Sequence, residues 1–216
     1  MPIFDEPTRR LVLAAFFGAF AAPALAQRRL PATVLPPADR ALVDRAVAYL
    51  QGLQSARGRF VQIDPRGQIT RGTVYLQRPG RARFAYDPPS GLTVVSNGST
   101  VSMSDTRLRS FQSYPLAATP LSLFLGREIN LNRGVIVDRV ARRPDGFDIV
   151  ARDARRQAEG RIQLSFSNAP ALTGWTLVDP QGQATRVQLS EFAPTSGLNP
   201  SLFVLRDPRP RTGPRG

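Results

Sequence analysis

The residue types that most often carry enzyme chemistry are absent from this sequence of 216 residues, which contains no histidine and no cysteine. Histidine is the commonest general base and metal ligand, and the cysteine thiolate is a common nucleophile. The composition therefore excludes Ser-His-Asp and Cys-His catalysis, and it also excludes disulfides, cysteine-ligated metals and a lipid-modified cysteine.

The remaining candidates for acid–base chemistry are carboxylates beside turns. Asp145 and Asp148 flank one turn, and Asp153 and Glu159 flank another. Acidic residues at such positions are typical of solvated turn formers. The sequence also lacks the spacing of a calcium loop and a glycine-rich loop that leads from a strand into a helix. We therefore predict a protein that is not an enzyme and has no catalytic residue, metal site or cofactor.

Positive charge is the most extreme feature of the composition. All 29 basic residues are arginine, and the net charge is +13. Such a charge favours polyanions, anionic membrane surfaces or acidic partners. Nucleic-acid binding would require arginines clustered on one element together with stacking aromatics, whereas these arginines are scattered along most of the chain. We therefore predict no nucleic-acid partner and interpret the charge as spread over solvent-exposed strand faces.

Residues 1–26 have the pattern of an export signal. The pair Arg9-Arg10 precedes an apolar run over residues 11–22, and a small-x-small cleavage site follows at residues 24–26. The apolar run is shorter than the roughly 20 residues that a membrane span requires. We predict a signal peptide that is cleaved after Ala26, with export by either the Sec or the twin-arginine route.

The rest of the chain reads as one domain with two irregular ends. Residues 27–38 are proline-rich and predict an extended lead-in, and residues 207–216 predict a flexible basic tail. Between them, residues 39–206 predict a single domain. No further segment is apolar and long enough to predict a transmembrane helix.

Two helices are predicted. The first would be capped by Asp39 and has an apolar stripe of helical spacing, made by Leu42, Val43, Ala46, Val47, Leu50 and Leu53. The second is short and almost wholly apolar. Thr119-Pro120 would open it as cap and first residue, and Gly126 would end it, with a possible further helical turn over residues 127–132.

Strands dominate the remainder. Ala82, Phe84 and Tyr86 alternate with Arg81 and Arg83, which predicts a sheet with one apolar and one solvated face. The predicted strands are residues 59–64, 68–77, 81–86, 92–96, 100–104, 108–113, 135–142, 147–152, 160–166, 172–178 and 184–192. Short, regular turns such as Asn97-Gly98 join them, which is typical of an antiparallel meander.

These elements predict a mainly β fold with helices (α+β). A sheet of this size tends to curl to protect its edges. We expect a strongly curved antiparallel sheet that forms an unclosed β-barrel of about eleven strands. The N-terminal helix and the short apolar helix would cover its concave face.

Many large apolar side chains could face one interior. They are Phe60, Val74, Leu76, Phe84, Tyr86, Val94, Leu121, Phe124, Leu125, Trp175 and Leu177. One interpretation is an ordinary filled core. The other is a cavity that two helices fill only in part and that binds apolar ligands. The residue pattern alone leaves both open.

An ordered set of short motifs narrows the choice. Phe60-Val61-Gln62 is followed by the segment 72–80 (GTVYLQRPG), then by 83–86 (RFAY), 95–98 (VSNG) and 119–121 (TPL). In this order, the block from residue 55 to residue 125 resembles the periplasmic outer-membrane lipoprotein carrier family (LolA-like).

The resemblance implies an unclosed β-barrel with a helical lid, whose cavity takes the acyl chains of lipoproteins. It implies a periplasmic carrier that shuttles them from an inner-membrane lipoprotein-releasing ABC transporter to an outer-membrane acceptor. The family's arginine that ties the lid shut falls on Arg78, and its large aromatic on the next strand falls on Phe84. Lid residues would be Leu121, Phe124 and Leu125. Together with Phe60, Val74, Leu76, Tyr86, Val94 and Trp175, these form the predicted ligand site. A monomer is expected.

Other functions remain open from the sequence. A module of the same fold could sense lipids or lipoproteins without shuttling them, although the absence of cysteine argues against a lipoprotein acceptor. An envelope protein could bind polyanions through its arginines. A hydrolase with an unusual Ser or Asp site is the last alternative.

Overall fold

The structure, a computed structural model, describes residues 35–119, 121–126, 135–154 and 160–207. The first half of the chain forms the strands β1 (Ser55–Ile63), β2 (Ile69–Gln77), β3 (Arg81–Tyr86), β4 (Leu92–Asn97), β5 (Thr100–Asp105) and β6 (Ser110–Pro115). The second half forms β7 (Val135–Arg143), β8 (Gly146–Asp153), β9 (Arg161–Ser167), β10 (Leu172–Val178) and β11 (Ala184–Pro194). The predicted signal peptide and basic tail lie outside the described residues, apart from Asp207.

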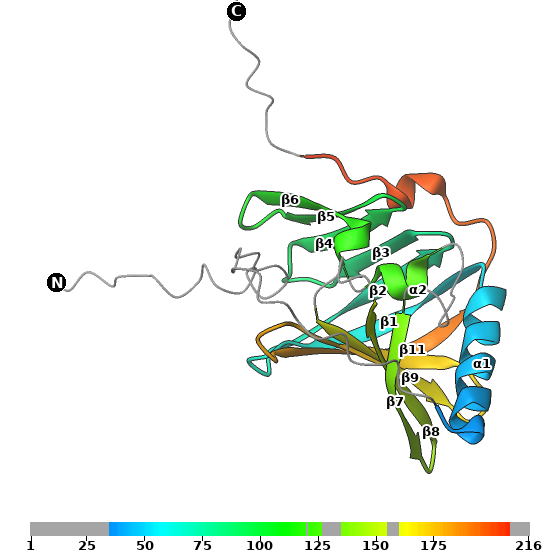
Figure 1. Ribbon diagram of the computed structural model, residues 1–216. Coiled ribbons are helices and arrows are strands. Elements are labelled where there is room, and N and C mark those ends of the chain that lie inside the picture. Colours follow the sequence, from blue (N-terminus) through cyan, green and yellow to red (C-terminus); the bar gives the residue numbers. More distant parts are fainter. Residues whose placement is uncertain (1–34, 120, 127–134, 155–159, 208–216) are drawn as a thin grey trace, which may run out of the picture.

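All the strands belong to one antiparallel sheet, in the order β6-β5-β4-β3-β2-β1-β11-β10-β9-β8-β7. The two halves meet where β1 pairs with β11, with Phe60 opposite Leu189. β6 and β7 lie at the two ends of this order, so the sheet is unclosed. Figure 1 shows the sheet curving around α1 (Pro37–Gly52) and α2 (Ser122–Leu125). The predicted fold class is confirmed.

The first helix begins earlier than the sequence predicts. Pro36 precedes the helix and Pro37 is its first residue, and no side chain caps it. Proline suits this position because its fixed φ is helical and its missing N–H would have no partner there. The predicted cap at Asp39 is therefore wrong. The apolar stripe is confirmed, since Val43, Ala46 and Leu50 are buried.

The second helix is preceded by a short 3-10 turn, η2 (Leu116–Ala118). The predicted cap at Thr119 is wrong, because its hydroxyl donates backward to the carbonyl of Leu116 at 2.8 Å. The Thr119 carbonyl accepts the backbone N–H of Ser122 at 3.1 Å instead. Gly126 follows the last helical residue, as predicted. Pro120 and the possible further turn over residues 127–132 lie outside the described residues.

Strand boundaries differ from the prediction most at β1, which begins four residues earlier, at Ser55, and next at β6, which begins two residues later. The Asp105 carboxylate accepts the backbone N–H groups of Arg107 at 2.8 Å and Leu108 at 3.1 Å. Arg109 has a positive φ of 48°. These contacts make residues 106–109 a turn rather than the start of a strand.

The interior lies between the inner face of the sheet and the two helices. One cluster of buried apolar residues joins α1, α2, β1 to β5 and β7 to β11. On the outer face, the short helix η3 (Pro200–Phe203) packs against β3 and β4 and buries Phe203. Arg83 donates to the Leu202 carbonyl at 3.1 Å, so the alternation predicted for β3 is confirmed. Within the described ranges, no helix has the length and apolar character needed to cross a bilayer.

Candidate functional site

Four aromatic side chains form a continuous row on the inner face of the sheet. Phe60 of β1 contacts Tyr86 and Phe84 of β3, with ring centroids 5.0 and 5.7 Å apart. Phe84 in turn contacts Trp175 of β10 at 5.8 Å. All three contacts are edge-to-face, which the ring quadrupoles favour. The structure thus brings these four predicted site residues together, and their role as ligand contacts stays a prediction.

Gly72 makes room for this row. It lies opposite Phe60 on one side and opposite Tyr86 on the other. A Cβ at Gly72 would lie 2.6 Å from the Phe60 ring and 2.3 Å from the carbonyl oxygen of Ala85. The Phe60 ring therefore occupies the space that a larger residue would need. The sequence had identified Gly72 only as part of a motif.

Aliphatic side chains complete the wall. Val74 lies opposite Phe84 in the pairing of β2 with β3, and Val94 lies opposite Phe84 in the pairing of β3 with β4. Leu76 is next on the same face of β2. All of these are at most 9% exposed, as are Leu121 and Leu125 beside and within α2. The side chain of Phe124 lies outside what the structure describes. We call this apolar inner surface of β1 to β4 and β10 the wall.

Arg78 joins the wall to both helices. It lies in the turn between β2 and β3, and its Nη2 donates to the carbonyl of Gly126, directly after α2, at 2.6 Å. Its Nη1 donates to the carbonyl of Leu50 in the last turn of α1. Burial lowers the pKa of the Arg78 guanidinium, but arginine keeps its charge in proteins. One cation therefore holds the C-terminal ends of α1 and α2 together.

The backbone of the same turn adds further bonds. The N–H of Gly80 donates to the carbonyl of Leu125 at 2.7 Å, and the N–H of Arg78 donates to the carbonyl of Gln54 at 2.8 Å. The Ser96 hydroxyl donates to the Gly80 carbonyl at 2.6 Å. Gly80 has φ +75°, and a Cβ there would lie 2.6 Å from Gly98. Among the described residues, the hydrogen bonds from this turn to α2 and its C-terminal end include one from the Arg78 side chain and one from the Gly80 backbone.

Contacts spread along α1, from its first turn to its last, fix the helix to the opposite half of the sheet. Asp39 forms an ion pair of 2.8 Å with Arg142 of β7. Arg45 donates to the backbone carbonyl of Asn168, in the turn between β9 and β10, at 2.6 Å. Tyr49 packs edge-on against Phe166 of β9, with ring centroids 6.3 Å apart. We call these contacts the α1 anchor.

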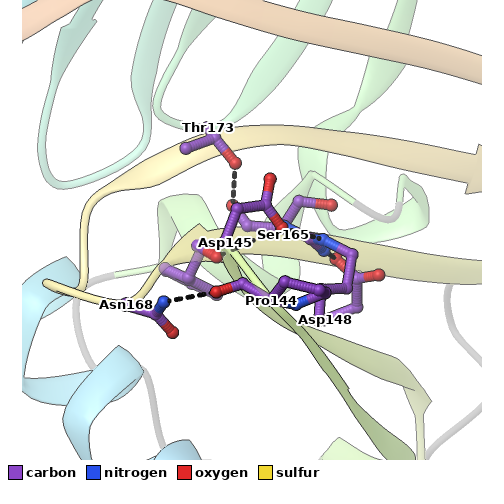
Figure 2. Close-up of polar contacts among 8 residues, drawn as sticks. Pro144, Asp145, Asp148, Ser165, Asn168 and Thr173 are labelled. Atoms are coloured by element: carbon purple, nitrogen blue, oxygen red, sulfur yellow. Dashed lines mark hydrogen bonds and ion pairs between the residues drawn. The ribbon is translucent and has the colours of Figure 1, made fainter.

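Hydrogen bonds and ion pairs stabilise the β9–β10 turn, which Arg45 contacts, and the neighbouring β7–β8 turn (Figure 2). The side-chain amide of Asn168 donates to the carbonyl of Pro144 at 2.9 Å, which joins the β9–β10 turn to the β7–β8 turn. Arg143 forms ion pairs with Asp145 at 3.1 Å and with Asp148. The contact with Asp148 is the main cause of the raised pKa of Arg143. The carboxylate pair considered for acid–base chemistry is therefore engaged in structural ion pairs.

A second polar feature lies beside the aromatic row. The hydroxyl of Tyr86 donates to the Oε1 of Gln62 on β1 at 2.7 Å. Burial raises the pKa of the Tyr86 hydroxyl, so this group stays protonated. Gln62 belongs to a motif that the sequence identified, but nothing in the sequence indicated its contact with Tyr86.

Comparison with known proteins gives a clear family assignment. Residues 51–206, which are more than half of the chain, match the family described as "Outer membrane lipoprotein carrier protein LolA". The chain belongs to the LolA family. The family suggested by the sequence motifs is thereby confirmed, and the match extends well beyond the block that carried them.

Curated relatives of this LolA-family chain carry the same description. An outer-membrane lipoprotein carrier protein from Chromobacterium violaceum is 24% identical over 196 residues, which cover 87% of this chain and 94% of the relative. One from Methylococcus capsulatus is 27% identical over 76% of this chain and 83% of the relative. One from Legionella pneumophila (strain Paris) is 28% identical over 74% of this chain and 83% of the relative.

Solved structures were also found. A LolA superfamily protein from Nitrosomonas europaea aligns with a TM-score of 0.44 and 12% identity, covering 77% of this chain and 97% of that protein. An uncharacterized conserved protein from Thermus thermophilus aligns with a TM-score of 0.46 and 14% identity, covering 81% and 96%.

The described site of this LolA-family chain presents an apolar surface with hydrogen-bonding groups at its borders, which suits the binding of apolar ligands. In the described parts of the chain, no three acidic side chains gather where they could hold a metal ion. Sequence reasoning missed the contact between Arg45 and Asn168 and the contact between Gln62 and Tyr86. Arg45 and Asn168 are 123 positions apart, so no local pattern could have joined them. The turn motif that contains Arg78 did predict the positive φ of Gly80.

Proposed function

We propose that this protein is a periplasmic carrier that binds the acyl chains of lipoproteins and shuttles them from the inner to the outer membrane. The observation that carries the proposal is the position of Arg78. A single guanidinium holds two helix ends, at Leu50 and Gly126, beside an apolar wall. Family membership supports the same conclusion.

The physical need for such a carrier follows from the hydrophobic effect. Each buried methylene contributes about 0.8 kcal/mol, so a lipoprotein with several acyl chains cannot cross water unshielded. The aromatic row and its aliphatic neighbours offer an apolar surface of the required kind. These side chains are covered in the present structure, so the proposal includes a movement of α2 away from the wall when a ligand enters.

In the described part of the chain, bonds from the turn between β2 and β3 oppose this movement. α2 has four residues, and the turn between β2 and β3 holds it by the bonds of Arg78 to Gly126 and of Gly80 to Leu125. A carrier must release its ligand as well as bind it, and a lid that opens readily serves both steps. In this proposal, the ligand comes from an inner-membrane lipoprotein-releasing ABC transporter, and an outer-membrane acceptor receives it. The carrier acts as a monomer.

Two measurements test the proposal. The mature protein, purified from the periplasm of its native host, is expected to carry acylated lipoproteins that mass spectrometry identifies. In a reconstituted assay, it is expected to move a lipoprotein from inner-membrane vesicles to outer-membrane vesicles. An empty protein that also fails to take up acylated peptide would contradict the proposal. Binding without transfer would favour the non-shuttling lipid sensor instead.

A further inference from the structure

Gln62 and Tyr86 form a polar pair at the border of the apolar wall. The Tyr86 ring contacts Phe60 and belongs to the interior, whereas the side chains of Gln62 and Tyr86 are both partly exposed. The hydroxyl of Tyr86 donates to Gln62 Oε1 at 2.7 Å. The pair therefore lies where the apolar interior meets solvent.

The pair lies at the end of the wall farthest from Arg78. Tyr86 is the last residue of β3, and the turn that holds Arg78 precedes the first residue of that strand. Five residue steps of a β-strand span about 17 Å, at roughly 3.3 Å each. The wall thus has polar side chains at both ends, with the Arg78 cation at the helices and the neutral Gln62–Tyr86 pair at the opposite end.

Gln62 retains a donor. Its Oε1 accepts from Tyr86, and its Nε2 donates to no residue that the structure describes. The bond from Tyr86 to Oε1 leaves Nε2 as the side of the amide that can donate to a ligand. The resulting site offers N–H groups beside an apolar surface and has no charge of its own.

This chemistry matches one part of an acylated lipid. Ester and amide carbonyls connect the apolar chains to the glyceryl head, and they accept hydrogen bonds. Removing such an acceptor from water without a partner costs free energy. We propose that Gln62, oriented by Tyr86, donates to an acyl carbonyl of the ligand, so that the glyceryl head lies at this end and the chains run along the wall toward Arg78. This inference rests on the proposed carrier function.

A matched pair of ligands tests it. The first is a peptide with an S-(2,3-dipalmitoyloxypropyl)cysteine, and the second is the dihexadecyl ether analogue, which has chains of the same length but lacks the carbonyls. The chain contains one tryptophan, Trp175 in the wall, whose fluorescence reports binding. We expect the delipidated protein to bind the ester about three- to tenfold more tightly, as one net hydrogen bond predicts. Gln62→Leu should abolish that preference and leave the affinity for the ether unchanged.

The controls separate this role from a structural one. Gln112 accepts a hydrogen bond from Tyr114 at 2.9 Å on the edge strand β6, so Gln112→Leu removes a similar pair away from the wall and should keep the preference. If Gln62→Leu does not fold, the double variant Gln62→Leu with Tyr86→Phe removes both partners at once and should show the same loss. Equal affinities of the native protein for ester and ether would overturn the inference alone. Binding of neither ligand would overturn the carrier function with it.

Discussion

The guanidinium of Arg78 donates a 2.6 Å hydrogen bond to the backbone carbonyl of Gly126, and the same group donates to the carbonyl of Leu50. Carbonyls at helix C-termini have no partner within their own helix. Arg78 supplies donors to the ends of two helices that are distant in sequence. Displacement of either helix therefore breaks a bond to the same side chain.

Replacement of Arg78 by leucine should weaken the closed arrangement of α2. Each hydrogen bond from a charged donor contributes about 1.5–3 kcal/mol, so amide hydrogen exchange at Leu125 and Gly126 should become at least about tenfold faster. We also expect lower lipoprotein transfer, because α2 no longer returns to a fixed position. Exchange measured by mass spectrometry and a vesicle transfer assay test both effects.

Two variants serve as controls for that experiment. Arg78→Lys keeps the charge but lacks the planar guanidinium that reaches two carbonyls. We therefore expect amide exchange and lipoprotein transfer between those of the native protein and those of Arg78→Leu. Arg81 lies three residues away and is exposed, and among the described residues its side chain hydrogen-bonds only to Gln77, at 3.3 Å. Arg81→Leu should therefore behave like the native protein. Unchanged exchange and transfer in Arg78→Leu would refute the role of Arg78 in closure.

The α1 anchor should act separately from Arg78. Arg45→Ala removes the bond to the carbonyl of Asn168, so amides in the first three turns of α1 should exchange several-fold faster. Arg78→Leu should instead affect mainly the last turn of α1, near Leu50. Faster exchange in different turns of α1 in the two variants would mean that the N-terminal part of α1 stays on the β7–β10 half of the sheet while its last turn opens.

Arg66 provides the control for this comparison, because it lies on the exposed turn between β1 and β2, far along the chain from α1. Arg66→Ala should leave exchange throughout α1 unchanged. Uniformly faster exchange along α1 in both Arg45→Ala and Arg78→Leu would contradict separate roles, since it would mean that the helix detaches as one unit.

The sequence predicted the local features of this fold well. Alternation places Ala82 and Phe84 on the buried face and Arg83 on the outer face, as β3 shows. Turn residues such as Asn97 also act as expected, since its side chain accepts the backbone N–H groups of Ser99 and Thr100 at 2.9 Å. These features depend on neighbours within a few residues. The predicted role of Arg78 in holding the lid came from a family resemblance and not from the pattern of residues around it.

Contacts between distant segments were not predictable in the same way. Aspartate is a residue type that often caps helices, yet the Asp39 carboxylate pairs with Arg142 of β7. Arg45 looks like an ordinary solvated residue on the polar side of α1, and only the folded sheet brings Asn168 to it. Both cases depend on where β7 to β10 lie relative to α1. A single sequence carries no local signal for that placement.

Gly72→Ala should destabilise the protein strongly. The added Cβ would lie 2.3 Å from the carbonyl of Ala85 and 2.6 Å from the ring of Phe60. Overpacking of this kind costs about 1–3 kcal/mol, and the urea midpoint should fall accordingly. Gly52→Ala is the matched control, because a Cβ at Gly52 meets nothing within 4 Å and alanine is the better helix former. A neutral Gly72→Ala would show that the Phe60 ring is not fixed in this position.

The ion pair between Arg59 and Asp87 should make stability depend on acid pH. The bond from Arg59 holds the pKa of Asp87 below its usual value, which is about 3.9 in an unfolded chain. A carboxylate with a lowered folded pKa stabilises the fold above its unfolded pKa, and the contribution disappears as the pH falls through the folded pKa. The urea midpoint of Arg59→Gln should thus be slightly lower than that of the native protein at pH 6.

The difference between these midpoints should narrow below about pH 4, where Asp87 of the unfolded chain takes up a proton, and it should be lost as the pH falls through the lower pKa of Asp87 in the folded protein. Both side chains are 40% exposed, so the effect is small and 1 M salt should reduce it further. Glutamine keeps donor and acceptor groups on the strand that faces Thr73, whose hydroxyl accepts from the native Arg59 at 2.8 Å. The substitution therefore tests mainly the charge. A difference that stays constant from pH 6 to pH 2 would mean that Arg59 stabilises the sheet through packing or Thr73 and not through Asp87.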